Sequence, residues 1–257
     1  MNNGKKKVVR VMFGIPNEGH TEPEAYDNRL VMSQHLGALQ VVSFNGDKHF
    51  QGMDFNYPTG HQFEFYICSI GKVFTALARE RIAEEAVKQD MDYLFMIDDD
   101  MITDSDIFEK LYRHDKDIVA ALAFTRSHPY SPVIYNLNKG YDGITQSNYY
   151  VNYTVFDYPK DTLVECDAVG FGAVLIKCDV LRKMKKPWFM STAGSGEDIH
   201  FCHKAGEDGF KIHMDTSVKM GHVGYPKIIT EEDYLESANM DKIKEIYGQG
   251  QGLQKKS

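Results

Sequence analysis

The sequence of this 257-residue chain predicts an α/β fold, with a mostly parallel central sheet flanked by helices. The first observation is the run at 93–97 (YLFMI), which is apolar on both faces, as in a strand buried inside a parallel sheet. The second is that β-branched, apolar runs also occur at 8–13 (VVRVMF) and 117–124 (DIVAALAF). The third is that helix-forming segments lie between these runs. Alternating strands and helices favour a parallel sheet with right-handed crossovers.

The first half of the chain supplies the other elements of this sheet. Apolar residues at 70–89 lean to one side of a helix, and residues 103–106 offer N-cap side chains for a later helix. We also expect a helix at 25–39, a strand at 39–44 (LQVVSF) and a loop at 45–62.

The second half has a different character. Residues 127–161 contain seven tyrosines with Pro, Asn and Gly, which predicts antiparallel hairpins added to the sheet. These tyrosines either stack on a sugar or small acceptor, or form the hairpin's own half-buried face or an interface. Further expected elements are a glycine-containing strand segment at 164–178, a helix at 179–185, a helix from 197, a strand at 210–215 and a helix at 231–247. We expect one domain over 1–247 and a disordered polar tail over 248–257.

Composition limits the function classes. The formal net charge of -8 and the pI of about 5.7 argue against binding to nucleic acid or to an anionic membrane surface. The four cysteines form no CxxC pair, so we expect neither a disulfide framework nor a cysteine-ligated zinc site. No apolar run approaches the ~18 residues of a membrane span. These observations favour a cytoplasmic protein.

The run at 93–97 ends abruptly in three carboxylates, Asp98, Asp99 and Asp100. Open α/β sheets bind ligands at the carboxyl ends of their strands. Adjacent carboxylates there repel one another and lose hydration unless a cation neutralises them. Oxygen ligands suit Mg²⁺ or Mn²⁺, and Asp98 and Asp100 point the same way in an extended segment. The triplet therefore indicates a metal site on Asp98 and Asp100; the alternative is a solvated acidic turn.

Three later positions are further candidates. Glu197 and Asp198 follow a glycine-containing loop and open a predicted helix, either as complements to the helix dipole or as a positioned general base. His222 lies between glycines after a predicted strand, where a neutral imidazole can complete a Mn²⁺ site. Trp188, the only tryptophan, is either a core residue or a platform for a substrate.

In their order, these motifs resemble the GT-A-fold glycosyltransferases, especially the family 2-like enzymes and their small phage-borne relatives. The likeness covers about residues 8–225. One departure is the first loop, Ile15-Pro16-Asn17-Glu18, which is shorter than the usual Pro-x-Tyr-Asn-Glu. The likeness to these enzymes is carried by seven motifs: the Pro16-Asn17-Glu18 loop, Ala78-Arg79-Glu80, the DxD-type Asp98–Asp100, Gly170-Phe171-Gly172, Pro187-Trp188-Phe189, Glu197-Asp198 and His222.

The resemblance implies a Rossmann-like domain that moves a sugar from a nucleotide-diphosphate sugar to a carbohydrate or other hydroxyl acceptor, in a bacterial or phage-infected cell. Its cofactor would be Mn²⁺ or Mg²⁺, held by Asp98, Asp100 and His222. Asp198 matches the position of the base, and Glu197 would orient a sugar. The nucleotide sugar would contact Pro16, Asn17, Glu18, Arg79, Asp98, Asp99 and Gly172, and the acceptor would border Trp188. From the residues alone, Arg79 also fits a solvated helix face.

The chemistry agrees with this resemblance. A divalent cation stabilises charge on the leaving diphosphate, and a carboxylate removes the acceptor's proton. Attack from the face opposite the leaving group would invert the anomeric configuration, although the scaffold hosts both outcomes. One alternative is a sugar-nucleotide nucleotidyltransferase, which needs a basic glycine-rich loop, and residues 14–20 contain no Lys or Arg. Another is a non-catalytic sugar- or metal-binding protein.

Overall fold

The computed structural model describes residues 6–17, 21–142, 147–192, 195–224 and 228–237. Its central sheet has seven strands, and five of them run in the same direction because only β10 and β12 are antiparallel to their neighbours. This confirms the predicted mostly parallel sheet. The strand order is β10 (Leu163–Cys166), β13 (Ile212–Lys219), β7 (Ile118–Leu122), β12 (Ala173–Lys177), β5 (Tyr93–Ile97), β1 (Lys7–Asn17) and β4 (His61–Gly71).

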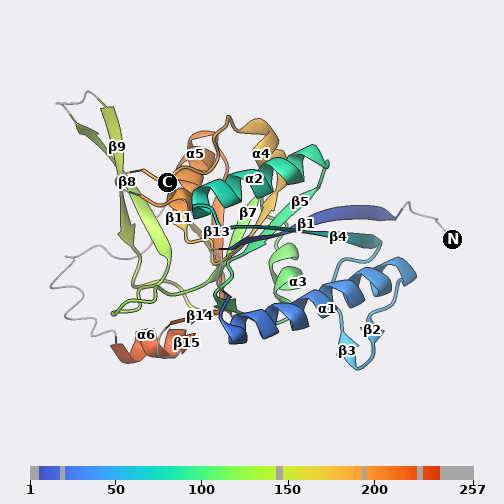
Figure 1. Cartoon of the computed structure of the whole chain (residues 1–257). Helices are drawn as coiled ribbons and strands as arrows, with labels where there is room; N and C mark the ends of the chain where they lie inside the picture. Colours follow the sequence, from blue (N-terminus) through green and yellow to red (C-terminus); the bar gives the residue numbers. More distant parts are fainter. Residues whose placement is uncertain (1–5, 18–20, 143–146, 193–194, 225–227, 238–257) are drawn as a thin grey trace.

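Helices cover both faces of this sheet (Figure 1). On one face lie α2 (Thr75–Lys88), α4 (Cys178–Lys183) and α5 (Glu197–Glu207); on the other lie α1 (Pro23–Asn45) and α3 (Ile107–Tyr112). The central strand β5 is buried throughout. Its Leu94 and Met96 belong to the first core cluster, and its Tyr93, Phe95 and Ile97 belong to the second. The apolar run is therefore a strand with a core on each side.

Residues 39–44 form the last turns of α1, so the strand predicted there is wrong. The buried residues Leu36, Leu39 and Val42 recur every three positions, which is a helical spacing. The β-branched pair in this segment favours a strand only weakly, and packing against the sheet overrides it. The helix ends at Gly46, whose φ of 82° is a left-handed conformation that glycine adopts readily.

The strand next to β1 is instead β4, which occupies 61–71. The sequence predicts a loop before this segment and a helix from residue 70, so β4 was missed and α2 begins at Thr75. The predicted loop at 45–62 holds a small hairpin of β2 (His49–Phe50) and β3 (Met53–Asp54).

The tyrosine-rich region forms the predicted antiparallel hairpin, β8 (Ile134–Asp142) and β9 (Ser147–Thr154). The hairpin pairs with β11 (Ala168–Val169) in a second sheet and not with the central one. The tyrosines of this region differ in exposure: Tyr153 of β9 is 43% exposed, whereas Tyr158, which follows β9, is buried. The side chains of 139–150 lie outside the described residues.

A third small sheet joins β6 (Met101–Ile102), β14 (Gly221–Val223) and β15 (Ile228–Ile229). The last described helix, α6 (Glu231–Ser237), begins where predicted. Its expected continuation to 247 and the tail at 248–257 lie outside the described residues. Within the described part of the chain, no helix is long and apolar enough to cross a membrane.

Candidate functional site

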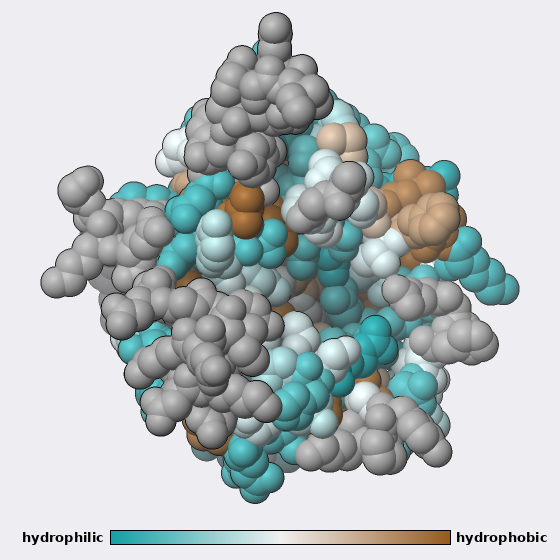
Figure 2. Space-filling view, turned by 90° about the vertical axis from the view of Figure 1, so that its left-hand side faces the viewer, coloured by the Kyte–Doolittle hydropathy of each residue, from teal (hydrophilic) through white to brown (hydrophobic). Residues whose placement is uncertain are grey.

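A cavity of about 330 Å³ lies where β1 and β5 end, the sheet edge at which a ligand site was predicted. Figure 2 looks onto this side of the molecule and shows mostly hydrophilic side chains around a hollow. Nine predicted residues line the cavity: Pro16, Asn17, Arg79, Asp98, Asp99, Asp100, Glu197, Asp198 and His222. Thr75, Arg126 and Gly196 also line it and were not predicted.

Backbone pairing brings distant segments to this cavity. The N–H of Asp98 donates to the carbonyl of Gly172 at 3.0 Å, which joins the end of β5 to the segment before β12. Met101 of β6 pairs with His222 of β14, and the N–H of Val223 donates to the carbonyl of Asp100 at 2.9 Å. His222 thereby lies beside Asp100 although 122 residues separate them.

Arg79 is buried between two carboxylates, so it does not belong to a solvated helix face. Its Nη2 donates to both carboxylate oxygens of Asp98, at 2.6 and 2.8 Å, and its Nη1 donates to Glu197. The side chain is only 3% exposed, and its guanidinium lies 5.6 Å from the ring centre of Phe171. Burial alone would lower its pKa, but the charges of the nearby carboxylates raise it. Arg79 therefore stays charged and ties α2 to the ends of β5 and α5.

Two carboxyls of the cavity have raised pKa values. Burial raises the pKa of Asp98 to about 6, with further repulsion from Asp100 and Asp198, although Arg79 opposes the shift. Burial and then the charge of Glu197 raise the pKa of Asp198, again against the effect of Arg79. Such shifts concentrate at functional sites because catalytic acids and bases need them.

Asp100 has different partners. Its Oδ2 lies 3.1 Å from His222 Nε2 and 3.3 Å from Arg126 Nη1. Burial would raise the pKa of Asp100, but the hydrogen bond and charge of His222 and the charge of Arg126 lower it below its usual value. His222 Nδ1 lies 2.7 Å from the carbonyl of Phe124, which can only accept, so Nδ1 carries a proton.

A third arginine, Arg29 of α1, lies near the acidic triplet. Its Nη1 lies 3.4 Å from the carbonyl of Asp98. Burial lowers the pKa of Arg29, although the charges of Asp99 and Asp100 oppose this shift. The protein's own guanidiniums thus neutralise much of the triplet. Arg29, Arg79 and Arg126 face five carboxylates, which leaves two negative charges before His222 is counted.

The remaining charge and the donor chemistry fit one divalent cation at Asp100 and His222. Among the described residues, no group of three or more His, Cys, Asp or Glu side chains is arranged to hold a metal ion. The predicted ligand Asp98 bonds to Arg79 instead. A pair of protein ligands is nevertheless ordinary for an ion that binds together with phosphates, since such ions keep waters and take phosphate oxygens.

Three predicted site residues are not among the described residues that line the cavity. Trp188 is 3% exposed and its indole N–H donates to the carbonyl of Met184 at 3.2 Å, so it is a core residue and not an acceptor platform. Gly172 does not line the cavity, and a Cβ there would meet the side chain of Met101 at 3.0 Å. Glu18 lies outside the described residues.

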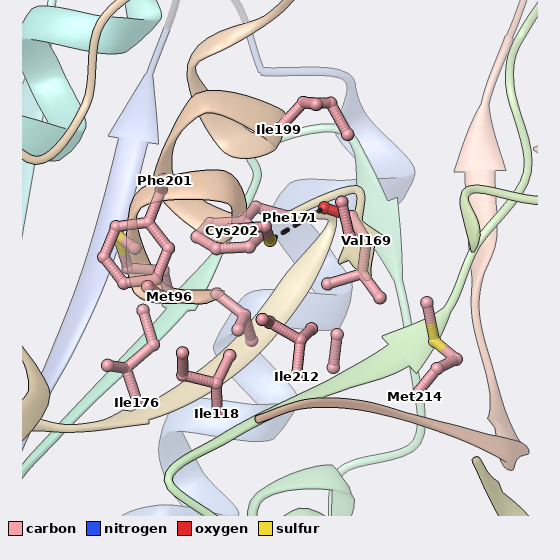
Figure 3. Close-up of a cluster of buried hydrophobic side chains, with 14 of the residues drawn as sticks. Met96, Ile118, Val169, Phe171, Ile176, Ile199, Phe201, Cys202, Ile212 and Met214 are labelled. Atoms are coloured by element: carbon pink, nitrogen blue, oxygen red, sulfur yellow. Dashed lines mark hydrogen bonds between the residues drawn. The ribbon is translucent and has the colours of Figure 1, made fainter. Parts of the chain in front are cut away.

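A hydrophobic cluster beneath the cavity holds α5 in place (Figure 3). Phe201 of α5 is fully buried, stacks on Phe189 with ring centres 4.8 Å apart, and meets Phe171 edge-on at 5.4 Å. Cys202 Sγ lies 3.8 Å from the carbonyl of Val169, as the dashed line shows. The start of α5, which carries Glu197 and Asp198, is therefore fixed against the sheet.

Gly196 precedes these acids for a steric reason. A Cβ at this position would lie 2.7 Å from Asp198 Oδ1, closer than real Cβ contacts. The unpredicted Arg126 follows the predicted strand at 117–124, and the rule that ligands bind at strand ends could have found it. Arg29, inside a predicted helix, carried no such signal.

No protein-family model matches the chain, and no curated protein matches it. Among solved structures, the chain is similar to A197 from STIV, with 19% sequence identity and a TM-score of 0.51 over 84% of this chain and 86% of that chain. A further similar structure is GalNAc-T7 with UDP, GalNAc and Mn²⁺, with 12% identity and a TM-score of 0.46 over 83% of this chain and 43% of that one. At 19% identity, the likeness to A197 from STIV is one of fold alone.

Proposed function

We propose that the chain is a metal-dependent glycosyltransferase, which moves a sugar from a nucleotide-diphosphate sugar to an acceptor hydroxyl. The observation that carries the proposal is the convergence in one cavity of the acidic triplet, the Glu197–Asp198 pair and His222. These groups come from segments far apart in the chain, and they are the groups that the resemblance to GT-A glycosyltransferases singles out.

In this proposal, Asp100 and His222 hold Mn²⁺ or Mg²⁺. The bound cation would act as a Lewis acid that stabilises negative charge on the departing diphosphate. Pro16, Asn17 and Asp99 would face the nucleotide sugar, as their place on the cavity wall supports. Glu18 keeps its nucleotide-facing role as a prediction from the sequence.

Asp198 is the carboxylate best suited to act as the base. Asp98 and Glu197 are bonded to Arg79, and Asp100 to His222 and Arg126. Asp198 accepts the N–H of Ile199 at 2.7 Å and has no ion-pair partner among the described residues. It would accept the acceptor's proton while the new bond to the anomeric carbon forms and the bond to the diphosphate breaks. Attack opposite the leaving group would invert the configuration.

Arg79 would act here as a positioning residue. Its guanidinium is committed to Asp98 and Glu197, which supports a role in fixing these acids more than the nucleotide contact that the resemblance implies. Through Arg79, Glu197 would be held ready to orient a sugar beside Asp198. Because Trp188 is buried, the acceptor would bind against exposed parts of the cavity wall instead.

A thermal-shift screen tests the proposal. Wild type and Asp100→Ala are melted with UDP, GDP, CMP or ADP and their sugar-linked forms, with and without Mn²⁺. Ligand binding at a hundredfold excess over Kd stabilises the native state by about 2.7 kcal/mol. We expect a Mn²⁺-dependent rise in melting temperature with one nucleotide class, lost in Asp100→Ala. No shift with any nucleotide in a folded sample would refute the proposal.

Turnover separates an enzyme from a binding protein on the same fold. With the donor found in the screen, wild type should release free nucleotide diphosphate in the presence of acceptor sugars. Asp198→Asn should bind the donor with the same melting shift and release almost none, because the amide cannot take the proton. Equal turnover by the two proteins would remove Asp198 from its assigned role.

A further inference from the structure

Two side-chain nitrogens approach one oxygen of Asp100. His222 Nε2 and Arg126 Nη1 both approach Oδ2, at 3.1 and 3.3 Å. Both are placed by the same segment after β7: the carbonyl of Phe124 fixes the His222 ring, and Arg126 follows two residues later. A change at Asp100 is therefore felt by His222 and Arg126 together.

The two arginines of the cavity wall differ in how firmly they are held. Arg79 is 3% exposed and bonds to two carboxylates, so moving it would leave buried charges without a partner. Arg126 is 54% exposed, and its one ion pair among the described residues is a contact of 3.3 Å, beyond ordinary hydrogen-bond length. Because water already reaches this guanidinium, breaking its pair with Asp100 costs less than breaking the buried pairs of Arg79. Arg126 can therefore leave Asp100 more easily than Arg79 can leave its two carboxylates.

The position of Arg126 also overlaps the proposed cation site. Its guanidinium supplies a positive charge beside the Asp100 carboxylate, which His222 Nε2 approaches as well. A divalent cation bound by Asp100 and His222 would repel this guanidinium, and the cavity is the open space into which its exposed side chain can turn.

We propose that Arg126 is an exchangeable counter-ion with two partners: it neutralises Asp100 when no divalent cation is bound, and it binds a phosphate group of the nucleotide diphosphate when one is. The identity of that anion rests on the proposed function. The planar guanidinium matches the geometry of phosphate oxygens, and of the cavity's two arginines it is the one free to reach a ligand. Arg126 is thus a specificity residue for diphosphate over uncharged ligands.

Two titrations by calorimetry test this role in Arg126→Gln. First, MnCl₂ is titrated into nucleotide-free protein: loss of the competing guanidinium should lower the Mn²⁺ Kd about two- to fivefold. Second, UDP and GDP are titrated at saturating Mn²⁺: loss of the charged contact should raise the Kd of the bound diphosphate about ten- to hundredfold. The matching nucleosides, which lack phosphate, should bind equally to both proteins.

Lys186→Gln is the matched control, because Lys186 is 52% exposed, pairs with Glu84 at 2.7 Å and lies outside the cavity. It should behave as wild type in both titrations. Unchanged affinities for Mn²⁺ and diphosphate in Arg126→Gln, in a wild type that binds both, would overturn the role of Arg126 alone. A wild type that binds neither Mn²⁺ nor either diphosphate would overturn the proposed function as well.

Discussion

Replacing Arg79 with Met removes the cation that two carboxylates of the cavity share, while keeping a side chain of similar length. Asp98 and Glu197 are 24% and 14% exposed, so water can solvate them only in part once the guanidinium is gone. Removing one partner of a buried pair costs about 3–5 kcal/mol. We expect the free energy of unfolding to fall by this amount at pH 7.5.

The loss should depend on pH with a definite sign. The pKa of Asp98 is about 6 in the folded protein against 3.8 for the free side chain, so folding favours its protonated form even with Arg79 present. Its contribution to stability is complete below the unfolded pKa and is lost as the pH rises through about 6. Without Arg79 the folded pKa rises further, so the destabilisation by Arg79→Met should shrink markedly between pH 7.5 and pH 5.5.

Urea unfolding of the metal-free protein at both pH values measures this difference. Arg182→Met is the control, because Arg182 also bridges two carboxylates, Asp90 and Asp179, which are 88% and 73% exposed. Its loss should stay within about 1 kcal/mol and should not depend on pH. The reasoning is refuted if Arg79→Met lowers the free energy of unfolding no more than Arg182→Met does, or by the same amount at both pH values. Arg79 would then not stabilise the fold by pairing with its two carboxylates.

Three further predictions concern other parts of the molecule. Phe201→Ala should lower the free energy of unfolding in urea by about 3–5 kcal/mol, because the ring is fully buried and stacked on Phe189; a loss below about 1 kcal/mol would contradict that packing. Gly196→Ala should cut turnover by about a hundredfold with little change in melting temperature, because its Cβ would displace Asp198. Wild-type turnover in this variant would contradict that steric effect. Burial would raise the pKa of Glu231, but hydrogen bonds from Lys219 and two other side chains lower it to about 2 from 4.5. Glu231→Gln should therefore be less stable by about 1–2 kcal/mol at neutral pH, and the gap measured by urea unfolding should narrow from pH 4.5 toward pH 2; a constant gap would contradict the ion cluster.

Short stretches of sequence were enough to predict the central strand and the sheet edge at which it ends. The apolar run at 93–97 predicted the central strand, and its abrupt end in Asp98 predicted the sheet edge at which the cavity lies. These two inferences need only the order of residues along one strand. The resemblance to GT-A glycosyltransferases implied that Pro16 and the acidic triplet share one site, and both line the cavity.

The errors arose where tertiary contacts decide. Residues 39–44 have strand-forming side chains, yet they continue α1 because Leu39 and Val42 pack against the sheet. The choice of Asp98 as a metal ligand left out the protein's own cations: Arg79 bonds to Asp98, and arginines from three separate segments neutralise much of the triplet. The sequence carries no local sign that Arg29, inside a predicted helix, will lie against an acidic cluster about seventy residues away in the chain.

The antiparallel strand β12 has a consequence for how the protein is made. It lies between β5 and β7, although both of them precede it in the chain by about fifty residues or more. On the ribosome, β5 and β7 would each keep an unpaired edge until residue 177 has emerged, and such edges promote association between chains. Nascent chains that end before β12 should therefore aggregate or need a chaperone, whereas chains that include it can complete the middle of the sheet.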